Sequence, residues 1–137
     1  MHENNILKKF LELQEDWYED ALNEIRKGRL EHYNIFYIFP HLRGRDLTEV
    51  TLRYGLRNIE EAKDYYEHPI LGTRLIEATQ LVLLQNRDID EIFNYRVSER
   101  FRACMTLFFH ATQDEIFMKA IKKFYNGNED AYTLERL

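Results

Sequence analysis

The chain of 137 residues has a size typical of one domain with a substantial buried core, and its 45% hydrophobic and 31% charged residues argue against a disordered polypeptide. Two prolines and five glycines are too few for a sandwich or barrel of many short strands joined by tight turns. The net charge of −5 opposes the phosphate backbone of nucleic acid, which argues against a dedicated nucleic-acid binder.

The charge pattern and the cysteine content bear on where the protein functions. Residues 1–10 mix charged with apolar side chains, unlike the continuous apolar centre of a signal peptide, and no apolar run approaches the roughly 20 residues that cross a bilayer. Cys104 is the single cysteine, so it forms no intrachain disulfide and no zinc site of paired cysteines. We therefore expect a soluble cytoplasmic protein with no membrane contact, no metal and no other cofactor.

Residues 5–27 are predicted to form the first helix. Apolar residues recur there every three or four positions, the spacing of one helix face, and they are Ile6, Phe10, Leu13, Trp17, Ala21 and Ile25. Gly28 suits the left-handed conformation that follows a helix C-terminus. The intervening positions are mostly acidic, which predicts a solvated outer face rather than a metal site.

The aromatic run Tyr33–Phe39 is an ambiguous element. It is mostly apolar and too short for periodicity to separate a strand from a buried helix, so both alternatives stay open. Pro40 takes the preceding residue out of helical geometry, and the Arg-Gly-Arg-Asp sequence at 43–46 predicts a loop.

The rest of the chain is predicted to be helices separated by glycine, proline or capping residues. The expected segments are Thr48–Tyr54, a helix capped by Asn58 and ended by His68–Pro69, Ile70–Gln85, Asp88–Phe93, Ser98–Ala111, a helix capped by Thr112 and ended at Asn126, and a final turn at Thr133–Leu137. Residues 81–84 leave no polar face, so this end of its helix is expected to lie centrally in the core. The sequence thus predicts a mainly α fold: a compact single domain over residues 1–137, built as an array of six or more helices.

Arg100 is the first of five candidate ligand-binding residues. In the helix expected over 98–111, it projects toward the apolar side, where a guanidinium needs a partner. In a structural role, its stem extends to the surface or its guanidinium pairs with a carboxylate of the protein. In a functional role, the guanidinium forms an anion-binding fork. The opposite face, expected to meet solvent, carries Arg102, Thr106 and His110.

Two histidines are further candidates. His68 precedes Pro69 at a rigid corner between two helices, where an imidazole can cap backbone groups or face a cleft. His41 follows the aromatic run, with Arg43 and Arg45 close behind it. It either joins a cationic pocket or belongs to a surface loop.

Arg74 and Tyr37 complete the set. Arg74 lies three residues before Glu77 on a helix expected to be well buried, so mutual pairing is its default explanation. Tyr37 offers an amphipathic wall for a ligand pocket, or it is part of the core and its rim.

Several motifs in order resemble those of one bacterial family. They are Tyr37-Ile38-Phe39-Pro40, Glu61-Ala62, His68-Pro69-Ile70-Leu71-Gly72, Arg74-Leu75, Met105-Thr106-Leu107-Phe108 and, near the end, Gly127, Asp130, Thr133 and Leu134. Over essentially the whole chain the sequence resembles the family catalogued as domain of unknown function eighteen-ten. The resemblance implies a compact, mainly helical single domain, and it implies no activity, because none is established for the family.

The chain also departs from that family at positions of interest. The family pattern has His-Trp-Met-Trp where this chain has residues 33–36, Gln in place of His41 and Lys in place of Arg100. If those family residues form a site, this protein carries an altered version of it.

Three functional hypotheses follow. The first is a binding module that accepts a small anionic or nucleotide-like ligand in a cleft lined by aromatic residues and by Arg74 or Arg100. The second is a hydrolase-like or transferase-like enzyme that uses His41 or His68 as acid or base. The third is a structural or protein-interaction domain, such as a homodimer, whose exposed aromatic residues form the partner surface.

Overall fold

The computed structural model describes residues 5–28, 35–45 and 49–137, and its regular structure there is helical apart from one isolated bridge pair. The helices in this part of the chain are α1 (Asn5–Arg26), α2 (Ile35–Ile38), α3 (Glu49–Tyr54), α4 (Ile59–Glu67), α5 (Leu71–Leu83), α6 (Ile89–Ile92), α7 (Tyr95–Thr112), α8 (Glu115–Tyr125) and α9 (Ala131–Leu134). The prediction of a mainly α fold is confirmed. Within the described ranges, every helix is too short or too polar to cross a membrane.

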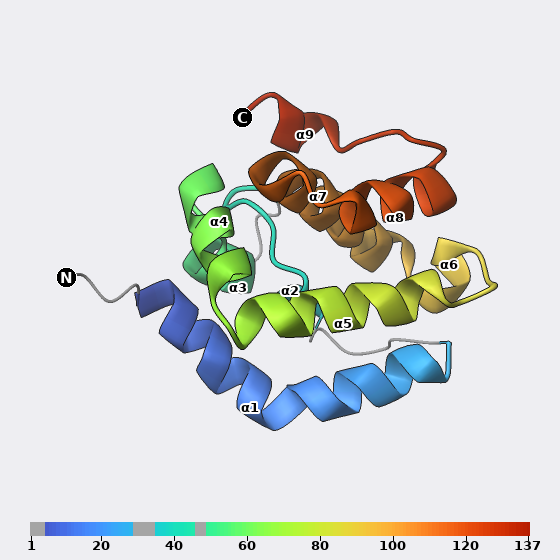
Figure 1. Cartoon of the computed structure of the whole chain (residues 1–137), viewed down its shortest axis with the longest axis horizontal. Helices are drawn as coiled ribbons and strands as arrows, with labels where there is room; N and C mark the ends of the chain where they lie inside the picture. Colours follow the sequence, from blue (N-terminus) through green and yellow to red (C-terminus); the bar gives the residue numbers. More distant parts are fainter. Residues whose placement is uncertain (1–4, 29–34, 46–48) are drawn as a thin grey trace.

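Helix α7 occupies the centre of the molecule. It contacts α2, α4, α6, α8 and α9, and the side chains of residues 103–108 are all fully buried. In Figure 1, α1 and α5 lie side by side along one edge, α7 and α8 lie on the other side of α5, and α9 lies over α7. The buried apolar side chains of the described residues join into one continuous cluster around α7.

Buried aromatic rings connect α7 to the N-terminal half of the chain. Phe10 of α1 meets Phe36 of α2 at 5.9 Å and Tyr65 of α4 at 5.3 Å between ring centroids. Tyr65 in turn meets Phe108 of α7 at 5.5 Å. Full burial of one such ring contributes about 2–3 kcal/mol from apolar transfer alone, so these contacts fix how α1, α4 and α7 pack.

The described part of the ambiguous run is a helix except for Phe39, which follows it. Residues 35–38 form the single turn of α2, while Tyr33, Asn34 and Thr48 lie outside the described residues. The loop that follows α2 runs beside the segment between α3 and α4, where Arg43 N donates to Leu56 O at 2.8 Å and Leu56 N donates to the carbonyl oxygen of His41 at 3.0 Å.

Two predicted helix starts are wrong. The N-cap of α7 is Asn94, whose side chain accepts from the backbone N–H three residues later at 2.9 Å, and Ser98 lies inside the helix. The N-cap of α8 is Asp114, because Thr112 is still the last residue of α7. Asn and Asp cap as well as Ser and Thr, so neighbouring candidates cannot be ranked from residue type. The cap predicted at Asn58 is confirmed.

The expected central position of residues 81–84 is also wrong. Val82 is fully buried, but Leu84 is 74% exposed, because α5 ends at the edge of the molecule where α1 and α8 cover only part of it. Trp17, predicted on the inward face of α1, is 43% exposed. Periodicity identifies an apolar face without showing how far the neighbouring elements extend over it.

Candidate functional site

The corner between α4 and α5 carries a hollow lined by chemically useful groups. His68 has an extended backbone (φ −66°, ψ 128°) and Pro69 follows, so α4 stops and α5 starts within a few residues. The first turn of α5 packs directly on the last turn of α4 at Gly72, where a Cβ atom would lie 1.9 Å from the carbonyl oxygen of Tyr66. Only glycine permits this approach.

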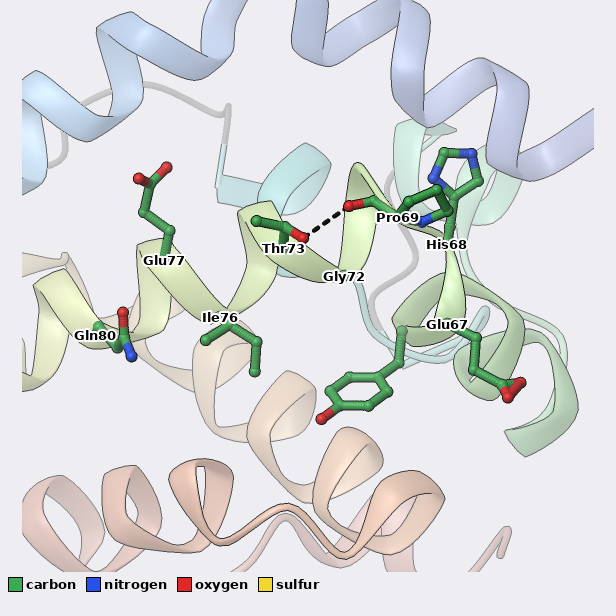
Figure 2. A pocket seen from close by; sticks show the side chains of 9 residues that line it. Glu67, His68, Pro69, Gly72, Thr73, Ile76, Glu77 and Gln80 are labelled. Carbon is green, nitrogen blue, oxygen red and sulfur yellow. Dashed lines mark hydrogen bonds between the residues drawn. The ribbon is translucent and has the colours of Figure 1, made fainter.

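A hollow of about 580 Å³ lies over this corner, and we call it the Gly72 groove. Its lining residues are Tyr66, Glu67, His68, Pro69, Gly72, Thr73, Ile76, Glu77 and Gln80. The volume falls within the range of small-molecule sites in proteins. Figure 2 shows Glu77 on the side of α5 that faces α1, Ile76 on the side that faces α7 and α8, and Glu67 and His68 beyond the N-terminal end of α5.

The imidazole of His68 caps α5 and also lines the groove. Its Nδ1 accepts hydrogen bonds from the backbone N–H groups of Ile70 at 3.1 Å and Leu71 at 3.3 Å. Because Nδ1 is the acceptor, the neutral ring carries its proton on Nε2. Both alternatives expected for His68, capping and facing a cleft, therefore hold together.

The hydroxyl hydrogens around the groove are used inside the protein. Thr73 donates to the carbonyl oxygen of Pro69 at 2.7 Å, and Tyr66 donates to the carboxylate of Asp114 at 2.6 Å. The hydrogen bond to Asp114, followed by burial, raises the pKa of Tyr66 to about 12, so its hydroxyl stays protonated at neutral pH. The oxygens of Thr73 and Tyr66 are left to a ligand as acceptors.

The formal charge of the groove is negative. Glu67 and Glu77 are both exposed, and the lining contains no lysine or arginine. Glu77 accepts a hydrogen bond from Tyr18 of α1. Burial and then this hydrogen bond raise the pKa of Tyr18, which keeps the Tyr18 hydroxyl a donor. The carboxylate of Glu67 forms no ion pair or hydrogen bond with the described part of the chain.

A smaller hollow of about 220 Å³ adjoins the groove. Its lining residues are Lys63, Tyr66, Glu67, Ala111 and Thr112, so it shares Tyr66 and Glu67 with the Gly72 groove. Lys63 is the cation that lines it, and we call it the Lys63 hollow.

Arg74 and Tyr37, both predicted ligand-binding residues, meet through Gln14 and do not line either hollow. The guanidinium of Arg74 lies over the ring of Tyr18, 4.9 Å from its centroid, and donates to Gln14 Oε1 at 3.3 Å. Gln14 Nε2 donates to the carbonyl oxygen of Tyr37 at 2.5 Å. Burial, then the nearby Tyr54, raises the pKa of the Tyr37 phenol.

His41 and Arg100 also stay outside the two hollows. His41 is fully buried, with Nδ1 3.0 Å from the carbonyl oxygen of Leu42 and its ring edge-on to Phe36. Its alternative placement in a surface loop is therefore wrong. Arg100 is buried on α7, as its position toward the apolar side predicted. Of the five predicted residues, His68 alone lines the Gly72 groove.

Gln14 is a polar residue that the sequence reasoning missed. It is 1% exposed in the middle of α1, and its amide also donates to the hydroxyl of Tyr65 at 2.9 Å. A signal existed, because Phe10, Gln14 and Tyr18 are spaced by four on the face that packs against the core. A polar residue within an apolar stripe indicates a buried hydrogen-bond network.

The polar stripe on α7 does not face solvent as expected. Thr106 is fully buried, and its hydroxyl accepts from the backbone N–H of Asp130 at 2.9 Å. His110 Nε2 lies 2.8 Å from a carboxylate oxygen of Glu129. The segment that leads into α9 thus covers this face through polar contacts, which apolar periodicity does not detect. Helix α9 begins at Ala131, two residues before the final turn that was expected at 133–137.

Comparison with known proteins identifies relatives of the chain. The fold is similar to the crystal structure of the conserved hypothetical protein Rv1873 from Mycobacterium tuberculosis, with a TM-score of 0.92 and 38% sequence identity over 96% of this chain and 95% of that chain. Curated proteins give no match. The family model described as "Protein of unknown function (DUF1810)" matches residues 4–137. This match confirms the resemblance in the motifs, and the chain belongs to the DUF1810 family.

Proposed function

We propose that the protein is a small-molecule binding domain whose ligand places an amine or guanidinium group in the Gly72 groove. The observation that carries the proposal is that both charged groups of the lining are carboxylates, those of Glu67 and Glu77. The hydroxyl hydrogens of Thr73 and Tyr66 are bonded within the protein, and Glu67 and Glu77 accept only. These acceptors favour a ligand that brings donors, and positive charge strengthens those hydrogen bonds.

This ligand class differs from the anionic or nucleotide-like one expected from the sequence. That expectation required arginine in the cleft, whereas Arg74 is turned toward Tyr18 and Arg100 lines neither hollow. The enzyme hypothesis gains no support either, because His41 is fully buried away from the groove that His68 lines.

Several lining groups are held in place before a ligand arrives. The His68 imidazole accepts hydrogen bonds from two backbone N–H groups. The hydroxyls of Thr73 and Tyr66 donate hydrogen bonds to Pro69 and Asp114, respectively. Such groups lose little conformational entropy when a ligand binds. The groove is open to solvent, however, so its charge contacts are screened, and we expect dissociation constants on the order of 0.1–1 mM.

Titration with agmatine tests the proposal, because this probe carries a guanidinium and an amine but no acid group. We expect saturable shifts of the backbone amide NMR signals of residues 66–80. Glu67→Gln and Glu77→Gln should each weaken binding about threefold to tenfold. Glu12→Gln removes an equal charge from an exposed position of α1 that lines neither hollow, and it should leave the affinity within about twofold.

Two outcomes would overturn the proposal. One is the absence of saturation by agmatine at concentrations well above about 1 mM. The other is saturation by inorganic phosphate with shifts around Arg74 or Arg100, which would support the anionic ligand expected from the sequence.

A further inference from the structure

The Lys63 hollow places a cationic side chain beside the Gly72 groove. Tyr66 and Glu67 line both hollows, so the two adjoin each other at these residues. Lys63 and Glu67 are four residues apart on α4, which places them about 6 Å apart along the helix axis. An ammonium and a carboxylate therefore stand one helical turn apart at the junction.

The ammonium of Lys63 is available for exchange with a ligand. It lies 3.5 Å from a carboxylate oxygen of Glu60, and both side chains are largely exposed, at 45% and 73%. Such a pair contributes little to stability and is readily replaced by a better-placed anion. The rest of the hollow offers no competing donor: the hydroxyl of Thr112 donates to Phe108 O at 2.7 Å and accepts from Asp114 N at 3.0 Å.

The wall between the two hollows is rigid. The hydroxyl of Tyr66 donates a hydrogen bond to the carboxylate of Asp114. Asp114 in turn caps α8 by accepting from the backbone N–H of Ile116 at 3.1 Å. The ring of Tyr66 also packs edge-on to Phe117, with 6.1 Å between centroids. Tyr66, the residue between the two hollows, is therefore held in place by α4 and α8.

We propose that the ligand is zwitterionic, a basic amino acid or a close derivative whose carboxylate binds Lys63 while its cationic group lies in the Gly72 groove. This inference rests on the proposed function and adds the acid group to it. A chain of a few methylene groups between the two charges matches one helical turn and crosses the edge of Tyr66. A bare amine fills one of the two hollows, and a zwitterion fills both.

Arginine and agmatine differ by the carboxylate alone, and the Lys63→Gln variant shows how much of any difference in affinity comes from Lys63. We expect the wild-type protein to bind arginine about threefold to fivefold more tightly than agmatine, the modest gain of a partly exposed charge pair. Lys63→Gln should bring the two dissociation constants together and leave that of agmatine unchanged. Lys119→Gln, which removes an exposed charge from α8 outside both hollows, should preserve the preference.

The outcomes separate this inference from the function on which it rests. Equal binding of arginine and agmatine by the wild type, or a preference that survives in Lys63→Gln, overturns the zwitterionic ligand while the amine-binding groove stands. Failure of both probes to bind overturns both proposals. Because Lys63 is a partly exposed surface residue, the variant is expected to fold, and circular dichroism verifies this.

Discussion

Asp130 is a buried charged residue whose loss should lower stability strongly. Asp130→Ala is expected to lower the free energy of unfolding by about 3–5 kcal/mol, because the carboxylate serves several donors at once. Its side chain is 4% exposed and lies 2.9 Å from Nη2 of Arg45, whose Nε also donates to it at 3.0 Å. It further accepts from the backbone N–H of Thr133 at 3.0 Å and from the Thr133 hydroxyl at 2.7 Å.

The magnitude follows from these contacts taken one by one. Loss of the N-cap of α9 costs about 1 kcal/mol. The buried hydroxyl of Thr133 and the guanidinium of Arg45 each cost about 1–3 kcal/mol when left without this acceptor. Arg45 is 22% exposed and regains some hydration, so its share belongs at the lower end. Asp130→Asn keeps an acceptor for the cap and removes only the charge, and it should cost about 1–2 kcal/mol.

The pH dependence supplies a second readout. Burial by itself would raise the pKa of Asp130, but hydrogen bonds from Arg45 and Thr133, with the charge of Arg45, outweigh it and lower the pKa below its ordinary value of 3.8. A carboxyl group with a lowered pKa stabilises the fold fully above that ordinary value and loses the contribution as pH falls below it. Urea unfolding should therefore show a wild-type advantage over Asp130→Asn that is smaller at pH 3 than at pH 7. A difference independent of pH, or an Asp130→Ala variant within about 1 kcal/mol of wild type, would refute the reasoning.

Three further substitutions test local features by urea or thermal unfolding. Gly72→Ala gains about 1 kcal/mol of helix propensity, but its Cβ atom would lie 1.9 Å from the Tyr66 carbonyl oxygen. The clash should dominate and lower the free energy of unfolding by about 1–2 kcal/mol. A raised melting temperature would show that α4 and α5 separate easily. His68→Ala removes the acceptor at the start of α5 and should cost about 1 kcal/mol, whereas an equally stable variant would mean that water replaces the imidazole. Asn94→Ala should cost about 1 kcal/mol if this residue caps α7, and no loss would contradict that assignment.

The helices were largely predictable because their information is local. Apolar spacing predicts α1 and α5. Gly28 and Gly127, both with positive φ, mark the ends of α1 and α8. What periodicity cannot supply is the neighbour that covers a face. The stripe of Arg102, Thr106 and His110 is polar and yet partly or fully buried, because the segment before α9 meets it with its own polar groups.

The candidate site was predictable only where backbone chemistry fixed it. The pair His68–Pro69 forces a corner at the end of α4, and the imidazole there lines the groove. The direction of a long side chain is decided by tertiary partners. Arg74 was expected in a cleft or paired with Glu77. Instead, the guanidinium of Arg74 lies over the ring of Tyr18, and the hydroxyl of Tyr18 donates to Glu77. No pattern within α5 predicts a partner that comes from α1.

The arrangement around Tyr18 also controls the charge of the Gly72 groove. Tyr18 lies beneath the guanidinium of Arg74 and donates to the carboxylate of Glu77. The two charged groups, three residues apart on α5, are therefore kept from pairing directly.

Tyr18→Phe keeps the ring but removes the donor, which frees Glu77 to pair with Arg74 across one turn of the helix. The groove would then lose much of the negative charge that attracts a cation. Agmatine should bind the variant about threefold more weakly, at a stability cost of about 1 kcal/mol for the lost hydrogen bond, and the Glu77→Gln substitution should then have little further effect. Undiminished agmatine affinity in Tyr18→Phe would show that Glu77 does not depend on Tyr18 for its position in the groove.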